Sequence, residues 1–127
     1  MPSAEEARAR VLGLGATLRR GRRLQRDVIV DDAGLALVTS GCTLRVRDDD
    51  GHAYLTFKGV VVPGPLKVRE EIETQAASAE RLLAILSALG YSPIFRYEKY
   101  REEWAVPGAL IAIDETPIGT FLEIEGE

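Results

Sequence analysis

The chain has 127 residues, of which 46% are hydrophobic and 28% are charged, and its formal net charge is −4. These values exclude a wholly disordered chain and indicate a single domain over residues 1–127. The negative charge argues against nucleic acid as a partner, and no apolar run is long enough to predict a membrane span. One cysteine and the lack of an N-terminal targeting pattern favour the cytoplasm.

The first half of the chain, residues 1–62, predicts one helix followed by three strands. Ser3 and Glu6 have the spacing of a capping box at the helix start, and two glycines end the helix. Residues 19–23 predict a basic, solvated loop, whose charge could instead bind nucleic acid or guide an anionic substrate. The predicted strands cover residues 24–31, 42–48 and 53–59, with a hairpin turn at residues 48–51.

The second half, residues 63–127, predicts a strand, a helix and three more strands. Ser78 is the expected N-cap of the helix and Gly90 its left-handed C-terminal cap. The element order is that of a duplicated strand–helix–three-strand unit whose first copy has no opening strand. We therefore expect an α+β fold with a segment missing before Ser3. The predicted strands cover residues 67–75, 95–106, 109–114 and 120–125.

Charged side chains alternate with apolar ones along these strands. Such a pattern is also typical of any antiparallel sheet with one solvated face. Here, however, the polar positions are charged almost without interruption, and the basic and acidic groups are sorted by strand. A concave face of this kind would bind phosphate oxygens through Arg and Lys and a divalent cation through its carboxylates. The sorted residues are Arg45, Arg47 and Lys58 early in the chain and Glu123 and Glu125 late.

Other residue types that often carry chemistry have a simpler structural interpretation here. His52 is the only histidine, so a histidine-based catalytic triad or zinc site has no second histidine. We expect His52 to be an exposed turn residue. Residues 48–50 lack the ligand spacing of a calcium loop and predict a turn. We expect Cys42 to be a small buried residue. Tyr97 and Trp104 lie on a long predicted strand and are interpreted as packing residues rather than stacking ones.

Six short segments occur in the order found in one known family. The chain resembles the CYTH family, the triphosphate tunnel metalloenzymes, which includes class IV adenylate cyclases, thiamine triphosphatases and inorganic triphosphatases. The resemblance covers residues 24–125 and implies an antiparallel β-barrel of seven to eight strands that forms a tunnel, with helices outside. The segments are TLRVR at 43–47, LTFKG at 55–59, VREEIE at 68–73, EKYR at 98–101, IDETPIGTF at 113–121 and EIE at 123–125.

The resemblance also implies which residues form the site. Carboxylates would bind Mg²⁺ or Mn²⁺, and cations would hold the triphosphate. No catalytic residue is assigned, because the family's opening strand with Glu-x-Glu-x-Lys has no counterpart here: only Met1 and Pro2 precede the capping box at Ser3. The implied phosphate-binding residues are Arg45, Arg47, Lys58, Arg69, Lys99 and Arg101, and the implied metal ligands are Glu71, Glu73, Asp114, Glu123 and Glu125.

Several functions stay open at this point. The leading hypothesis is divalent-metal-dependent hydrolysis of inorganic triphosphate or an organic triphosphate. Cyclisation of ATP to cAMP by the same fold is the alternative enzyme activity. A module that binds polyphosphate without turnover is a further alternative, since the Glu-x-Glu-x-Lys strand is absent, and a degraded paralogue with a structural role is another. An open barrel also predicts a homodimer, because unpaired strand edges favour association.

Overall fold

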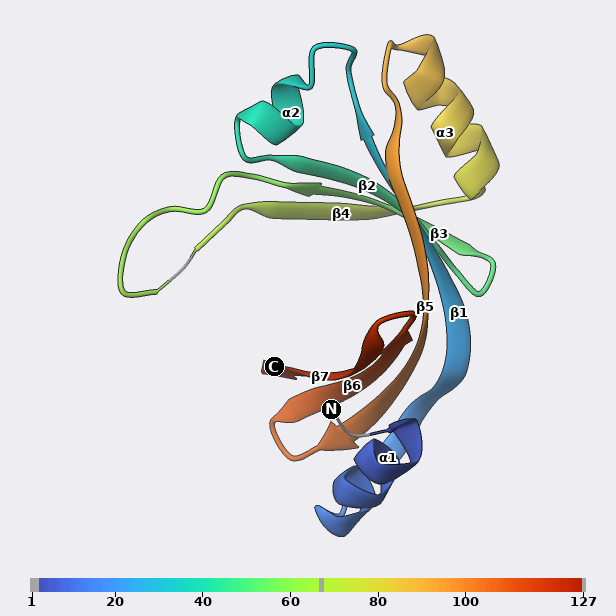
Figure 1. Cartoon of the computed structure of the whole chain (residues 1–127), viewed down its shortest axis with the longest axis vertical. Coiled ribbons are helices and arrows are strands. Elements are labelled where there is room, and N and C mark those ends of the chain that lie inside the picture. The colour runs from blue at the N-terminus through green and yellow to red at the C-terminus, as the bar shows by residue number, and fades with distance from the viewer. Residues whose placement is uncertain (1–2, 67, 127) are drawn as a thin grey trace. The chain divides into compact units, whose positions relative to one another are not determined.

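Seven antiparallel β-strands in one sheet and three helices form the part of the chain that the computed structural model describes, residues 3–66 and 68–126 (Figure 1). The strand order is β4-β3-β2-β1-β5-β6-β7. The α+β fold with an antiparallel sheet is therefore confirmed. None of the described helices is long and apolar enough to cross a membrane. The elements are α1 (Ala4–Gly13), β1 (Thr17–Asp31), α2 (Ala36–Thr39), β2 (Thr43–Asp49), β3 (His52–Lys58), β4 (Glu71–Ala76), α3 (Ala79–Ala88), β5 (Ser92–Val106), β6 (Ala109–Thr116) and β7 (Gly119–Gly126).

The chain divides into two compact units, and the long strands β1 and β5 contribute to both. The first unit combines the residues up to Gln25 with those from Glu98 onward, and the second unit is Arg26–Tyr97. Each unit has its own apolar core beneath one helix. The division of the sequence into two halves of a repeat, residues 1–62 and 63–127, stays a prediction.

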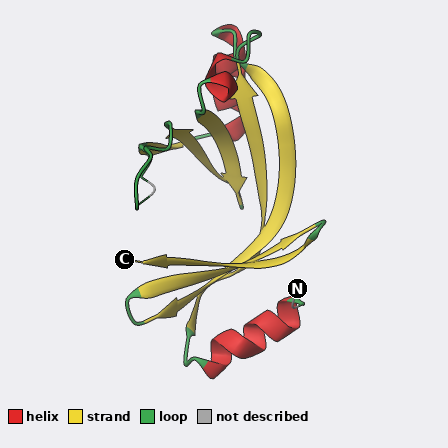
Figure 2. Ribbon diagram, turned by 60° about the vertical axis from the view of Figure 1, so that its left-hand side comes forward, coloured by secondary structure: helices red, strands yellow, loops and turns green. Residues whose placement is uncertain are grey.

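In the first unit, α1 packs on the sheet through one apolar stripe (Figure 2). The predicted cap is confirmed, since the Ser3 hydroxyl accepts a hydrogen bond from the backbone N–H of Glu6 at 3.2 Å. Ala7 and Val11 are four residues apart, so they lie on the same side of the helix and are both buried. Trp104 is buried in this core, as expected of a packing residue.

In the second unit, α3 covers the other apolar core. Ser78 accepts a hydrogen bond from the backbone N–H of Arg81 at 3.2 Å, and Gly90 has a φ of 97°, so both predicted caps are confirmed. Leu86 is buried against the sheet. The strand residues at this core are Val28, Val30 and Val46, with Leu44 and Leu55 beside them.

The predicted hairpin between β2 and β3 is confirmed. Asp49 pairs with His52, and Asp50 and Gly51 between them have positive φ values of 53° and 86°. Two consecutive left-handed residues form the turn that suits the twist of a two-residue hairpin. The Asp48 carboxylate accepts the Gly51 N–H at 2.9 Å, which explains the acidic run without a calcium ion. His52 is exposed, as predicted.

The predicted basic loop at residues 19–23 is wrong, because these residues lie within β1. Two of these residues, Arg22 and Arg23, have charged partners on other strands of the first unit. Arg22 Nε donates to Glu115 at 2.6 Å, and its guanidinium lies 3.9 Å from the centre of the Tyr100 ring. Arg23 is buried and donates to Glu103. Partners this distant in sequence stabilise a strand that its local composition does not suggest.

The remaining differences are small. Helix α2 was not predicted; the Asp31 carboxylate holds it by accepting the backbone N–H groups of Leu37 at 3.1 Å and Val38 at 2.9 Å. Strand β4 begins at Glu71 rather than residue 67, which itself lies outside the described residues, and β5 begins at Ser92 rather than residue 95. Cys42 is half-buried rather than buried.

Candidate functional site

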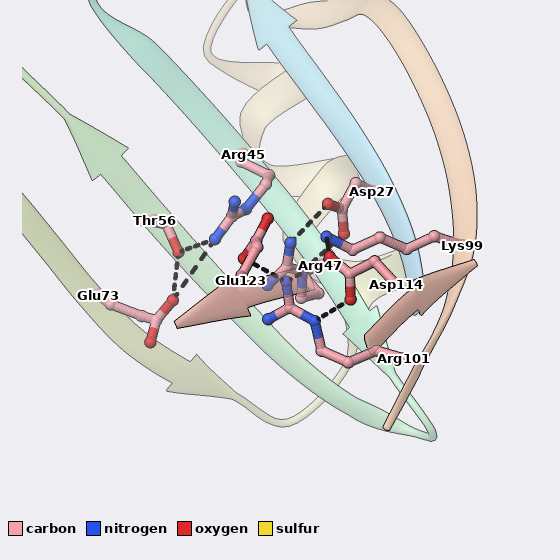
Figure 3. A network of polar contacts seen from close by, with 9 residues as sticks. All are labelled: Asp27, Arg45, Arg47, Thr56, Glu73, Lys99, Arg101, Asp114 and Glu123. Atoms are coloured by element: carbon pink, nitrogen blue, oxygen red, sulfur yellow. Dashed lines mark hydrogen bonds and ion pairs between the residues drawn. The ribbon is translucent and has the colours of Figure 1, made fainter. Parts of the chain in front are cut away.

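A row of polar side chains crosses β2, β3 and β4 on one face of the second unit (Figure 3). Arg45 lies opposite Thr56 in the cross-strand register, and Thr56 lies opposite Glu73. The Thr56 hydroxyl donates a hydrogen bond to Glu73 Oε1 at 2.6 Å and accepts one from Arg45 Nη2 at 3.4 Å. Arg45 Nη2 is 3.8 Å from Glu73 Oε1. The row therefore connects a cation to a carboxylate through one hydroxyl.

The Arg45 side chain is largely but not fully buried, and its guanidinium is incompletely paired. Its side chain is 11% exposed, and its Nε is buried without a hydrogen-bond partner among residues 3–66 and 68–126. Its two side-chain contacts are longer than the ~2.7–2.9 Å typical of a charge-assisted hydrogen bond. An unpaired buried donor costs about 1–3 kcal/mol, so an anionic oxygen at this point would be favourable.

Arg47, two residues along β2, has a tight partner. Its Nε and Nη2 each donate to the Asp27 carboxylate at 2.8 Å, and Asp27 is 1% exposed. Burial opposes ionisation of Asp27, but the hydrogen bonds from Arg47 and Tyr97 outweigh it and lower its pKa. Burial and the neighbouring Asp27 carboxylate raise the pKa of Tyr97. We call Asp27, Arg45, Arg47, Thr56 and Glu73 the Arg45 cluster.

A second group of charged side chains lies on β5, β6 and β7 of the first unit (Figure 3). Arg101 lies opposite Asp114 and binds it through two hydrogen bonds, Nε to Oδ1 at 2.6 Å and Nη2 to Oδ2 at 2.8 Å. Lys99 Nζ adds a third contact to Asp114 at 3.1 Å. Arg101 Nη2 also donates to Glu123 at 2.9 Å. We call Lys99, Arg101, Asp114 and Glu123 the Arg101 cluster.

The pairing within the Arg101 cluster stabilises the charged forms of its members. Burial alone would raise the pKa of Asp114, but Arg101 and Lys99 overcome this and lower it. Burial opposes the charge of Arg101, yet Asp114 and Glu123 raise its pKa. The cluster holds two cations and two carboxylates, so its formal charges cancel. Its carboxylates are therefore engaged by the protein's own cations.

The other predicted site residues lie near the edge of the second unit or on β7. Lys58 lies opposite Glu71 in the register of β3 and β4. Arg69 Nε donates to the Gly59 carbonyl at 2.9 Å, and its Nη2 lies 3.4 Å from the Gly41 carbonyl, so this side chain braces the loop before β4. Glu125 is exposed on β7. The phosphate and metal roles expected of these residues stay predictions.

The donor groups for a metal ion do not converge in the described residues. Within residues 3–66 and 68–126, no three Asp, Glu, His or Cys side chains are grouped so that they could hold a cation. Three of the expected ligands, Glu73, Asp114 and Glu123, contact arginine or lysine instead. The described residues therefore do not fit Mg²⁺ or Mn²⁺ by themselves, and metal binding stays a prediction.

Sequence reasoning missed three members of this polar network. Asp27 and Thr56 were not among the predicted site residues, and Tyr97 was interpreted as a packing residue. Tyr97 does lie beside Phe95, with ring centres 5.6 Å apart, but its hydroxyl also binds Asp27. The alternation of side chains along β3 could have identified Thr56. It places Leu55 and Phe57 on the apolar face of the strand and Thr56, between them in the sequence, on the polar face.

Comparison with known proteins identifies the family of the chain. The CYTH domain family model matches residues 2–127. The chain belongs to the CYTH family. It is 30% identical over 105 residues to MJ0240 of Methanocaldococcus jannaschii, a candidate adenylate cyclase. That alignment covers 82% of this CYTH chain, which spans only 60% of the length of the relative.

Solved structures agree with the assignment of the fold. The PH1012 protein of Pyrococcus horikoshii matches with a TM-score of 0.81 at 23% identity, covering 99% of this chain and 74% of the other. HpAC1 of Hippeastrum, for which a dominant triphosphatase activity is described, matches with a TM-score of 0.70 at 18% identity, covering 98% and 74%. These likenesses establish the CYTH fold of the chain.

Proposed function

We propose that this CYTH protein binds the phosphate groups of a triphosphate and hydrolyses it. Mg²⁺ or Mn²⁺ would be brought to the site by the triphosphate's own phosphate oxygens, because the described residues form no metal site by themselves. Family membership supports chemistry on a triphosphate, and HpAC1 offers a precedent for triphosphatase activity in this fold. Cyclisation of ATP is the second candidate, favoured by the 30% identity to MJ0240.

The observation that carries the proposal is the incomplete pairing of Arg45. A guanidinium presents several N–H donors in one plane, a geometry that matches phosphate oxygens. Within the described chain, Arg45 Nε is buried without a partner, and the contacts of Nη2 are 3.4 Å and 3.8 Å long. A phosphate oxygen would supply the missing acceptor with a charge-assisted hydrogen bond.

The other members of the Arg45 cluster have supporting roles in this proposal. Asp27 holds Arg47 by two hydrogen bonds, which fixes a second guanidinium on the same strand as Arg45. Thr56 holds Glu73 and limits the positions open to Arg45. Fixed cations stabilise the charge that develops as a phosphoryl group is transferred, and such reactions depend mainly on positioning and electrostatics.

Phosphate release from tripolyphosphate tests the proposal. The assay compares Mg²⁺, Mn²⁺ and a chelator, with ATP as a parallel substrate and cAMP as a second product to detect. We expect metal-dependent release of phosphate from tripolyphosphate. Formation of cAMP from ATP without phosphate release would favour the cyclase instead. Absence of turnover with every substrate and metal would contradict an enzymatic role for this chain.

A pair of matched variants assigns the activity to the Arg45 cluster. Arg45→Met keeps the apolar stem and removes the guanidinium, whereas Arg10→Met makes the same change at an exposed position of α1. We expect kcat/KM for tripolyphosphate to fall at least about tenfold in Arg45→Met, the loss of one charge-assisted hydrogen bond. Arg10→Met should match the wild type. Equal activity of the two variants would place the site elsewhere.

A further inference from the structure

An aromatic side chain, Phe95, lies on β5 next to the Arg45 cluster. Phe95 and Tyr97 are two residues apart, so they lie on the same face of the strand, and their ring centres are 5.6 Å apart. Both rings belong to the second unit, which also contains the whole Arg45 cluster. Phe95 is 59% exposed and lies outside both apolar cores of the described chain. Packing of a core therefore does not explain this ring.

Tyr97 connects the exposed ring to the two arginines. Its hydroxyl donates a hydrogen bond to the buried Asp27 carboxylate, which holds Arg47 by two hydrogen bonds of 2.8 Å. The positive charges of Arg45 and Arg47 also act on this hydroxyl, where they oppose the rise of its pKa. The phenol of Tyr97 is thus held at its polar end by the cluster, and Phe95 packs beside its ring.

The order of the strands sets the separation between the aromatic ring and the cations. Strand β5 neighbours β1, and β1 neighbours β2, which carries Arg45. Adjacent strands are about 4.8 Å apart, so β5 and β2 are separated by about 10 Å across the sheet. Phe95 is also offset from Tyr97 by about 7 Å along β5. A ligand that binds Arg45 through a phosphate and reaches Phe95 is therefore elongated, with a spacer between its phosphates and its far end.

We propose that Phe95 is a specificity-determining residue, which stacks on the base of a nucleoside triphosphate and makes the site prefer it to inorganic triphosphate. This inference rests on the proposed function and names the preferred substrate class for the same site. The sugar is the spacer that the separation of Phe95 from Arg45 requires. An aromatic side chain stacks on any base, because every base has a π-face. Phe95 thus recognises the presence of a base rather than its identity.

Calorimetric titration with chelator present tests this role, with three probes that share a triphosphate. ATP carries a base and a sugar, ribose 5-triphosphate carries the sugar alone, and tripolyphosphate has no organic group. We expect the wild type to bind ATP at least about fivefold more tightly than ribose 5-triphosphate, which is the lower end of the contribution of one stacked base.

Variants of β5 assign this preference to the ring. Phe95→Ala should abolish the advantage of ATP and leave tripolyphosphate binding unchanged, because Arg45 and Arg47 remain. Phe95→Trp keeps an aromatic ring and should keep the preference. Ile94→Ala is the matched control, since Ile94 is 41% exposed on the opposite face of the same strand, and it should match the wild type. Far-UV circular dichroism establishes that each variant is folded.

The three probes separate this inference from the proposed function. Equal weakening of all three probes in Phe95→Ala would mean that the ring only supports Tyr97, and would overturn the inference. Unchanged ATP binding in Phe95→Ala, or equal binding of ATP and ribose 5-triphosphate by the wild type, would overturn it as well. In each of these cases, tripolyphosphate binding by the wild type still supports the proposed function. A wild type that binds none of the probes would contradict both.

Discussion

Arg45 and Arg101 are both half-buried arginines on sheet strands, but Arg101 is fully paired and Arg45 is not. Arg101 makes two hydrogen bonds of 2.6 Å and 2.8 Å to Asp114 and a third, of 2.9 Å, to Glu123. Arg45 has contacts of 3.4 Å and 3.8 Å and, within the described chain, a buried Nε without an acceptor. Their side chains are almost equally buried, at 11% and 12% exposure.

This difference separates a structural cation from a binding cation. A buried ion pair with good geometry offsets its own desolvation, so breaking it by removing one partner is costly. A buried cation with poor pairing leaves free energy available to a ligand that completes its hydrogen bonds. We therefore assign stabilisation of the first unit to the Arg101 cluster and anion binding to the Arg45 cluster.

The largest expected effect comes from replacing each arginine by methionine and measuring unfolding by denaturant. Arg101→Met leaves Asp114, which is 2% exposed, with Lys99 as the remaining cation of its cluster. We expect it to lower the free energy of unfolding by about 3 kcal/mol or more. Arg45→Met leaves Glu73, whose side chain is 47% exposed and can be hydrated. It should change stability by less than about 1 kcal/mol. Similar losses in the two variants would remove the distinction between the clusters.

Acid sensitivity sharpens the same comparison. The folded-state pKa values of Asp27 and Asp114 are lowered, mainly by Arg47 and by Arg101 against the opposing effect of burial. Their contribution to stability is present above the unfolded-state pKa of about 3.9 and is lost as the pH falls through the lower folded-state value. The free energy of unfolding should therefore decrease below about pH 4.

Two carboxamide variants identify the source of this pH dependence. Asp114→Asn should reduce the acid slope of the unfolding free energy, because one of the two aspartates can no longer be protonated and Asp27 alone remains. Glu73→Gln keeps both aspartates and should retain the slope. A slope that is unchanged in Asp114→Asn would show that the Arg101 cluster does not determine acid stability.

The smallest effect is expected from the hydroxyl that connects Arg45 with Glu73. Thr56→Val removes the donor to Glu73 and the acceptor for Arg45 at a position with 0% exposure. Loss of this hydrogen bond should reduce the free energy of unfolding by about 1 kcal/mol. Thr74→Val, at an exposed position of β4, is the control and should lie within about 0.5 kcal/mol of the wild type. Equal stability of both variants would mean that Thr56 does not hold the row together.

The sequence predicted most of the fold because much of the fold is locally encoded. The caps at Ser3 and Ser78 and the turn at residues 48–51 depend on neighbouring residues, and the structure has all three. Residues 19–23 were assigned to a loop because their stabilising partners, Glu103 and Glu115, are far away in sequence. The short helix α2 depends likewise on Asp31, through a carboxylate whose partners no periodic pattern reveals.

The site was predictable by residue type but not by pairing. Alternation along the strands identified Arg45, Arg47, Lys99 and Arg101 as a charged set. The resemblance to the CYTH family gave all four the same phosphate-binding role, and a pattern of period two does not show which carboxylate lies opposite which cation. The pairs Arg47–Asp27 and Arg101–Asp114 depend on contacts between strands, and these contacts distinguish Arg45 from the other arginines.

The most direct test of the central claim is calorimetric titration of tripolyphosphate into the protein with chelator present. The wild type should bind, and Arg10→Met should bind equally well. Arg45→Met should bind at least about tenfold more weakly, because a hydrogen bond to a charged group contributes about 1.5–3 kcal/mol. Binding by Arg45→Met that equals the wild type would contradict the assignment of anion binding to the Arg45 cluster.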